Sequence, residues 1–199
     1  MAKYSETIER LIAELGKLPG IGARTAERLA FHLLKSSPAE AMALADAIRD
    51  VKTKIRPCKI CFNIAEDEVC AICGDPARDK SVIVVVEQPK DLLALESTGV
   101  HRGVYHVLMG HIAPLDDMEA EDLTIDALVA RVQAGGVSEV ILATNPTVAG
   151  DGTALHIQEL LKSTAVKITR LARGLPAGGQ IEYSNKSILA DALTERRKV

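Results

Sequence analysis

Aromatic side chains are scarce in this sequence. Its 199 residues include no tryptophan, two phenylalanines and three tyrosines. Proteins that hold single-stranded nucleic acid stack the bases on exposed aromatic rings, and such platforms need more rings than this chain has. The scarcity argues against a stacking platform for single strands and against an aromatic-lined ligand pocket.

Long apolar runs are also missing. A membrane-spanning helix needs about 18 consecutive apolar residues, whereas the longest strong run here is Val82–Val86. The first residues, Met1–Glu6, lack the apolar region of a secretion signal, so we expect a cytoplasmic protein without membrane contact. Disorder is not expected as the main character of the chain, because 47% of its residues are apolar and 26% are charged.

Charge is unevenly distributed along the chain, although the formal net charge is only −3. Residues 1–57 carry ten basic and seven acidic side chains, and the remainder carries fourteen and twenty. This asymmetry indicates either a polyanionic partner for the front segment or ordinary scatter of charge.

Hydrophobic periodicity predicts helices at the front and a strand–helix alternation behind them. Residues 5–17 and the segment after Gly22 each place apolar side chains on one helical face. Ser37-Pro38 has the pattern of an N-cap followed by Pro, which begins a third helix that runs to about Ile55. The expected later strands are Val82–Val86, Val104–Met109, Val140–Ala143 and Lys167–Leu171, with helices over Lys90–Glu96, Thr124–Ala134 and Ala154–Lys162. Such alternation predicts a parallel sheet covered on both faces. An edge strand over Gln180–Tyr183 and a last helix near Ser187–Leu193 are expected to follow.

The four cysteines form two Cys-x2-Cys pairs that are separated by eight residues: Cys58, Cys61, Cys70 and Cys73. Two such pairs place four thiolates at the corners of a tetrahedron, which is the ligand set of structural Zn²⁺. A disulfide pair is disfavoured by the missing secretion signal, and a redox Cys-x-x-Cys by the presence of two pairs. We therefore expect a structural zinc site with no open position for catalysis.

The break between the first two helices is Leu18-Pro-Gly-Ile-Gly22. Its glycines make a tight turn, and the backbone N–H groups of the turn and of the following helix start form an anion site. The stretch resembles the helix-hairpin-helix motif, which implies contact with the DNA backbone without base reading. The candidate DNA-binding residues are Gly20, Gly22, Arg24 and Arg28. The alternative is a helical hairpin whose glycines only turn the chain.

Glu87 follows the first strand of the sheet, where α/β proteins place their sites. The segment resembles the start of a Toprim domain, in which a Glu at this position is a general acid/base and acidic residues in a loop after the third strand hold Mg²⁺. In the matching loop here, Asn145 and Thr147 replace the two metal-binding Asp residues, and Asp151 is the remaining acid. Mg²⁺ is held mainly by carboxylates. We therefore expect the fold without cleavage chemistry, and a partner-docking or weak metal role, or none, for Glu87, Asn145 and Asp151. His111, which follows the second strand, is a candidate to line the same crevice.

In their order and spacing, these motifs resemble the bacterial recombination mediator RecR family over essentially the whole chain. Further matching segments are Val107–His111, Ile141–Thr147 and Gly174–Gly179. The family often has an acid where this chain has Ala149 and an Asp where it has Asn185. Each difference weakens a metal or RecO-docking role of the Toprim crevice.

The resemblance implies a non-enzymatic DNA-repair protein of the bacterial cytoplasm and nucleoid. RecR-like proteins act with RecO and RecF, help to load RecA on gapped DNA, and form tetrameric rings that can clamp DNA. It also implies binding to duplex DNA and to single/double-strand junctions without sequence preference, through basic positions that correspond to Arg24 and Arg28.

We therefore predict an α/β protein with four parts. They are a helix-hairpin-helix DNA-binding region (1–56), a four-cysteine zinc finger (57–76), a Toprim parallel-sheet domain (80–172) and a C-terminal strand–helix segment for subunit contact (173–199). One alternative is a Mg²⁺-dependent nuclease or topoisomerase-like enzyme that uses Glu87 and Asp151. Another is an interaction protein without DNA affinity, whose acidic run docks a basic partner or is simply solvated. That run comprises Asp116, Asp117, Glu119, Glu121 and Asp122.

Overall fold

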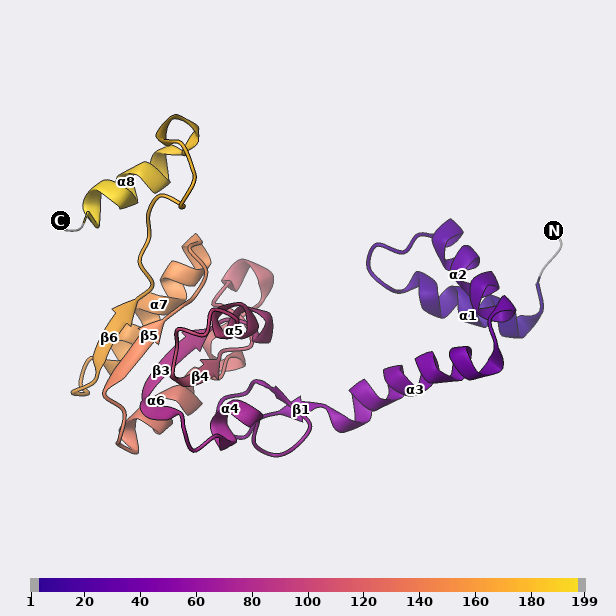
Figure 1. Ribbon diagram of the computed structural model, residues 1–199, viewed down its shortest axis with the longest axis horizontal. Helices are drawn as coiled ribbons and strands as arrows, with labels where there is room; N and C mark the ends of the chain where they lie inside the picture. Colours follow the sequence, from indigo (N-terminus) through magenta and orange to yellow (C-terminus); the bar gives the residue numbers. More distant parts are fainter. Residues whose placement is uncertain (1–3, 197–199) are drawn as a thin grey trace. The chain divides into compact units, whose positions relative to one another are not determined.

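The computed structural model describes residues 4–196. The chain forms two compact units, Met1–Ile55 and Arg56–Val199 (Figure 1). Residues 1–3 and 197–199 lie outside the described residues. The first three belong to the segment Met1–Glu6, and the last three to the predicted C-terminal segment. No helix of the described part is both long enough and apolar enough to cross a membrane.

The first unit consists of α1 (Glu6–Gly16), α2 (Ala23–Lys35) and α3 (Pro38–Lys54), which confirms the three predicted helices. Ala26 and Ala30 of α2 are fully buried, and their small side chains let α1 pack closely against α2. The start of α3 is fixed by a capping box, in which the Ser37 hydroxyl accepts a hydrogen bond from the amide of Glu40 and the Glu40 carboxylate accepts one from the amide of Ser37.

The second unit is built on a four-stranded sheet whose pairs are all parallel, as predicted. Its strands are β3 (Asp79–Val86), β4 (Gly103–Val107), β5 (Glu139–Leu142) and β6 (Lys167–Arg170), in the order β4-β3-β5-β6. In the central register, Val84 pairs with Tyr105 on one side and with Ile141 on the other. The carboxyl ends of β3 and β5 therefore lie beside each other.

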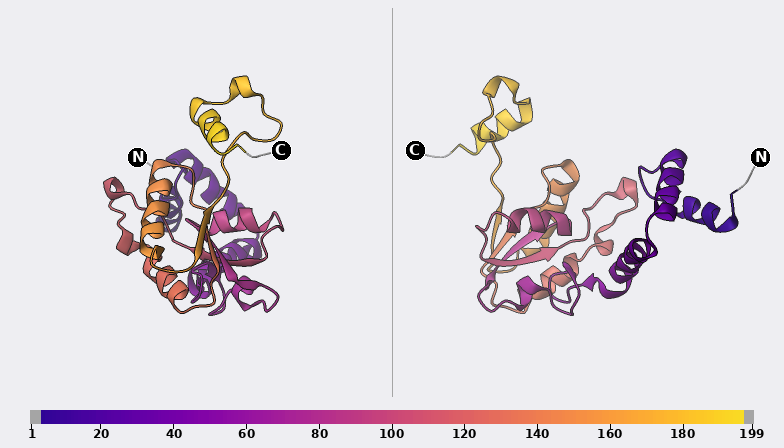
Figure 2. Two further views of the ribbon diagram at one scale, coloured as in Figure 1. Left: turned by 90° about the vertical axis from the view of Figure 1, so that its left-hand side faces the viewer. Right: turned by 45° about the vertical axis from the view of Figure 1, so that its right-hand side comes forward.

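Helices cover both faces of the sheet, and the two views of Figure 2 show the sheet between them. Ile83 and Val85 point to one face, against α6 (Ile125–Gln133) and α7 (Val148–Leu161). Val84 and Val86 point to the other face, against Leu92 of α5 (Pro89–Glu96). This alternation along β3 explains why a strand that is buried on both faces reads as a continuous run of β-branched residues.

The cysteine segment packs against the same sheet. It contains the two-residue strands β1 (Arg56–Pro57) and β2 (Ile64–Ala65), which are antiparallel, and the short helix α4 (Ala71–Gly74). Phe62 and Ile72 pack against the α5 face of the sheet. The amide of Val107 in β4 donates to the carbonyl oxygen of Cys61 at 2.8 Å. The segment is thus attached to β4 by backbone and side chains.

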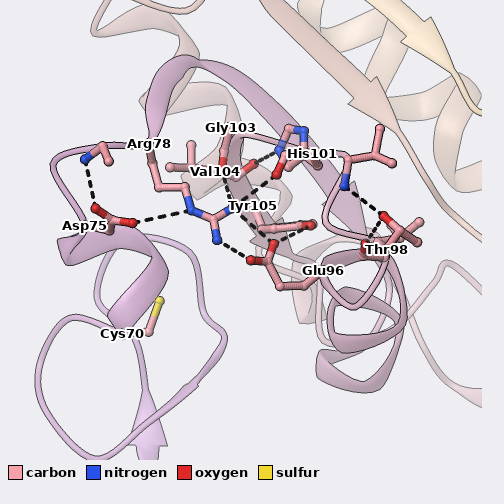
Figure 3. A network of polar contacts seen from close by, with 12 residues as sticks. Cys70, Asp75, Arg78, Glu96, Thr98, His101, Gly103, Val104 and Tyr105 are labelled. Carbon is pink, nitrogen blue, oxygen red and sulfur yellow. Dashed lines mark hydrogen bonds and ion pairs between the residues drawn. The ribbon is translucent and has the colours of Figure 1, made fainter.

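A polar network fixes the chain between the cysteine segment and β3 (Figure 3). The Arg78 guanidinium binds both carboxylate oxygens of Glu96 on α5 and also lies 3.8 Å from a carboxylate oxygen of Asp75. The Tyr105 hydroxyl donates to Glu96 at 2.9 Å. The hydrogen bonds from Arg78 are the main reason that the pKa of Glu96 is lowered. Burial, followed by the hydrogen bond to Glu96, raises the pKa of Tyr105.

Two expectations about element bounds were wrong. We predicted a helix that begins at Ala154, but α7 begins at Val148, because the Thr147 side chain accepts a hydrogen bond from the amide of Gly150 and caps the helix. Asp151 therefore lies in the first turn of a helix.

The second correction concerns the C-terminal segment. Instead of an edge strand over Gln180–Tyr183, residues Ile181–Tyr183 form a 3-10 turn, η3. The amides of Tyr183 and Ser184 donate to carbonyl oxygens three residues back and are not available to a neighbouring strand. The predicted last helix is confirmed as α8 (Lys186–Thr194), which the Asn185 side chain caps. Two further 3-10 turns, η1 (Pro114–Asp116) and η2 (Ala120–Asp122), shape the acidic loop.

Candidate metal centre, hairpin and sheet edge

The four cysteines lie together in the core of their segment. All four are buried and none is in a disulfide. Their sulfur atoms lie within 4.8 Å of one another. Four converging thiols without other ligand types match the tetrahedral sulfur set that structural Zn²⁺ takes.

Backbone amides support thiolates at this site. The Sγ atom of Cys58 accepts from the amides of Cys70 at 3.3 Å and Ile60 at 3.5 Å. Burial alone would raise the pKa of Cys58, but these amides and that of Cys61 lower it to about 7. A side-chain hydrogen bond with Cys73, burial and the neighbouring thiolates raise the pKa of Cys61. Four thiolates therefore need a cation among them, and Zn²⁺ supplies that charge when bound.

The hairpin between α1 and α2 has the geometry that its glycines predict. Gly20 has a φ of +80°, a conformation that favours glycine. Gly22 is the N-cap of α2 and has no side chain to pair with the first amides of the helix. Arg24 and Arg28 are exposed and one turn apart. This arrangement can hold an anionic backbone, and contact with DNA stays a prediction.

Glu87 is buried, and three donors surround its carboxylate. One oxygen accepts from the amide of Asn145 at 2.8 Å. The other accepts from the Asn145 side-chain amide at 2.7 Å and lies 3.1 Å from Nδ1 of His111. Gly150 allows this packing, because a Cβ there would lie 2.7 Å from the Glu87 carboxylate and 2.2 Å from the Asn145 carbonyl oxygen. The predicted neighbours Glu87 and Asn145 are thus brought together, with His111 as their third member.

Asp151 has other partners. The guanidinium groups of Arg170, at the end of β6, and of Arg173, in the following loop, both pair with one of its carboxylate oxygens. These contacts, led by Arg173, lower the pKa of Asp151. Within the described residues, the cysteines are the single group of three or more His, Cys, Asp or Glu side chains close enough to share a metal ion. Glu87 and Asp151 do not form such a group.

Sequence reasoning missed the two arginines at Asp151 and the Arg78–Glu96–Tyr105 network. Neither has a local sequence signal, because the partners come from separate strands, helices and loops. It also left His111 without a partner. His111 and Glu87 are 24 residues apart in the sequence, so their contact cannot be inferred until β3 and β4 are known to pair.

Three family models match consecutive parts of the chain. They describe a RecR helix-hairpin-helix over residues 8–52, a RecR four-cysteine zinc finger domain over 55–75 and a Toprim domain over 81–172. The fold and the cysteine site thus define a Toprim protein with a structural zinc finger and a helix-hairpin-helix.

Curated relatives match along the full length. Recombination protein RecR of Rhodopirellula baltica is 53% identical over 199 residues, and that of Rubrobacter xylanophilus is 51% identical over 199 residues, each covering all of both chains. Recombination protein RecR of Chloroflexus aggregans is 53% identical over 192 residues, which cover 96% of this chain and 94% of the relative. The chain therefore belongs to the RecR family of recombination proteins.

Proposed function

We propose that this protein is a non-catalytic, DNA-binding mediator of recombinational repair whose hairpin holds the phosphate backbone. The observation that supports it most directly is the exposed pair Arg24 and Arg28 beside the uncapped start of α2. Backbone amides, the helix dipole and two guanidinium groups there all favour phosphate and carry no base information. Membership in a family of recombination proteins is consistent with this role.

The partners and assembly follow from the same proposal. The chain acts with RecO- and RecF-like proteins to load RecA on gapped DNA, as a tetrameric ring that clamps duplex DNA and junctions. One subunit offers few phosphate contacts and has a net charge of −3. A ring joins several such sites, and avidity then strengthens binding without new contacts.

The contacts of the Toprim acids support a non-catalytic role over a Mg²⁺-dependent nuclease. Cleavage would need carboxylates that are free to hold Mg²⁺ near the reacting phosphate. Glu87 is bound by Asn145 and His111, and Asp151 by two arginines. We propose that Glu87 and Asn145 shape a surface for docking a partner.

The test is duplex DNA binding as a function of salt for the wild type and Arg24→Glu/Arg28→Glu, with Mg²⁺ present and DNA length checked afterwards. The slope of log affinity against log salt should fall by about 0.9 per lost phosphate contact, or about 1.8 for each engaged subunit. The matched control is Arg49→Glu/Lys52→Glu, the same charge reversal on exposed positions of α3.

Loss of binding in the hairpin variant, with wild-type binding in the control and intact DNA, supports the proposal. Equal loss in both variants would show that net charge, not the hairpin, governs binding. DNA cleavage that Glu87→Gln abolishes would replace the proposal with the enzyme alternative. Wild-type binding by the hairpin variant would refute the role of Arg24 and Arg28.

A further inference from the structure

Groups outside the sheet make hydrogen bonds with the backbone at the outer edge of β4. β4 stands at the end of the strand order, so the outward N–H and C=O groups of alternate residues have no β partner. The amide of Val107 donates to the carbonyl oxygen of Cys61, and the carbonyl oxygen of Tyr105 accepts from Nη1 of Arg131, both at 2.8 Å. The two bonded groups come from residues two apart on the strand and lie within about 7 Å of each other.

This edge brings Arg131 of α6 close to the backbone of Cys61, because both bind the outer side of the same strand two residues apart. Cys61 is one of the four clustered thiols, and the ring of Phe62 beside it packs on the ring of His106 with centroids 5.4 Å apart. Tyr105, which binds Arg131, and Val107, which binds Cys61, flank His106 on the strand. Burial lowers the pKa of Arg131, and the charges of all four cysteines oppose that shift.

Two other cations near the segment, Arg78 and Lys59, are paired with carboxylates. The Arg78 guanidinium is held by Glu96 (Figure 3), and the exposed Lys59 pairs with Glu68 at 2.7 Å. Arg131, by contrast, donates its hydrogen bond to a neutral backbone carbonyl. That bond supplies no negative charge to balance the guanidinium. A zinc ion with four thiolate ligands carries roughly two net negative charges.

We infer that Arg131 is the counter-charge of the zinc–tetrathiolate centre. It is a positioning residue. One of its N–H groups binds the Tyr105 carbonyl at the open edge of β4. Its positive charge stabilises the buried thiolates of the cysteine segment that packs at the same edge. Groups that surround a metal's ligands tune metal affinity through such charges and hydrogen bonds. The Toprim helix α6 thereby contributes to the zinc site, and the zinc segment and the sheet hold each other in place.

The test is the rate at which a colorimetric chelator removes zinc from the full-length, zinc-loaded protein. Arg131→Gln keeps a side-chain donor for Tyr105 but loses the charge, whereas Arg131→Lys keeps both a donor and the charge. We expect zinc release to be about 10-fold faster in Arg131→Gln and close to wild type in Arg131→Lys. The matched control is Lys59→Gln. It removes an exposed cation that is paired with Glu68 and lies between Cys58 and Cys61 in the sequence, and it should release zinc at the wild-type rate.

A second readout separates charge from folding. Circular dichroism of each zinc-loaded variant before chelation should match the wild type. Equal release rates for the Gln and Lys variants would overturn the inference and leave Arg131 only its bond to Tyr105.

Discussion

Adding a methyl group to Gly150 should destabilise the protein, whereas the same change at Gly152, two residues along α7, should stabilise it. A Cβ on Gly150 would lie 2.2 Å from the carbonyl oxygen of Asn145 and 2.7 Å from a carboxylate oxygen of Glu87. The first neighbour is backbone and cannot rotate away. A Cβ on Gly152 meets no atom within 4 Å.

The expected magnitudes follow from these contacts. Overpacking of this kind costs about 1–3 kcal/mol. Relief of the clash also moves Asn145 away from Glu87 and weakens charge-assisted hydrogen bonds of about 1.5–3 kcal/mol each. Against this, alanine is a better helix former than glycine by about 1 kcal/mol. Gly150→Ala should therefore lose about 3 kcal/mol of unfolding free energy, and Gly152→Ala should gain about 0.5–1 kcal/mol.

Urea denaturation of the zinc-loaded protein measures the difference. Circular dichroism is the appropriate probe, because the chain has no tryptophan for fluorescence. The two variants should differ by about 4 kcal/mol, and their melting temperatures should differ by roughly 8–16 °C in a domain of this size. A difference below about 1 kcal/mol would falsify the claim that Gly150 is required by the packing of Glu87 against Asn145.

Three further predictions concern the second unit. Leu128→Ala should lower the free energy of unfolding in urea by about 2–5 kcal/mol, because Leu128 is fully buried between α6 and the sheet. The control is Leu93→Ala, at a position that is 61% exposed, and it should change stability by less than about 0.5 kcal/mol. Burial holds the pKa of His106 at about 4, below the usual 6.5. As pH falls, the unfolded chain takes up this proton first, so stability is lost between pH 6.5 and 4, by at most about 3.4 kcal/mol. His106→Gln should show a correspondingly weaker loss of stability between pH 7 and 4.5. Asp151→Asn removes the charge that holds Arg170 and Arg173, so trypsin should cut after Arg173 faster than in the wild type. Stability should change by less than about 1 kcal/mol, because these side chains are partly exposed. An unchanged cleavage rate would show that the two ion pairs do not hold the loop.

The elements that the sequence predicted well are those with a local signal. Helical periodicity placed α1, α2 and α3, and the Ser37-Pro38 cap placed the start of α3 at the correct residue. The run of β-branched residues identified β3, and two Cys-x2-Cys pairs identified the metal centre, because four ligands from one short segment need no distant partner.

The errors arose where neighbouring groups decided the conformation. The hydroxyl of Thr147 captures the amide of Gly150, so α7 begins six residues before the expected position. We expected an edge strand at Gln180–Tyr183. A strand needs a neighbouring strand to complete its hydrogen bonds, and local bonds form the turn here instead.

The sequence by itself determined the order of the parts, the ligands of the metal centre and the positions of the hairpin glycines and arginines, because each of these depends on residues within a few turns of one another. The tertiary structure alone decided what the Toprim acids contact. The partners of Glu87 lie 24 and 58 residues away, and those of Asp151 lie 19 and 22 residues away. Such contacts exist only after parallel strands have paired and brought their carboxyl ends together. Arg131 and Cys61, from segments 70 residues apart, likewise meet only where both bind the outer edge of the folded strand β4.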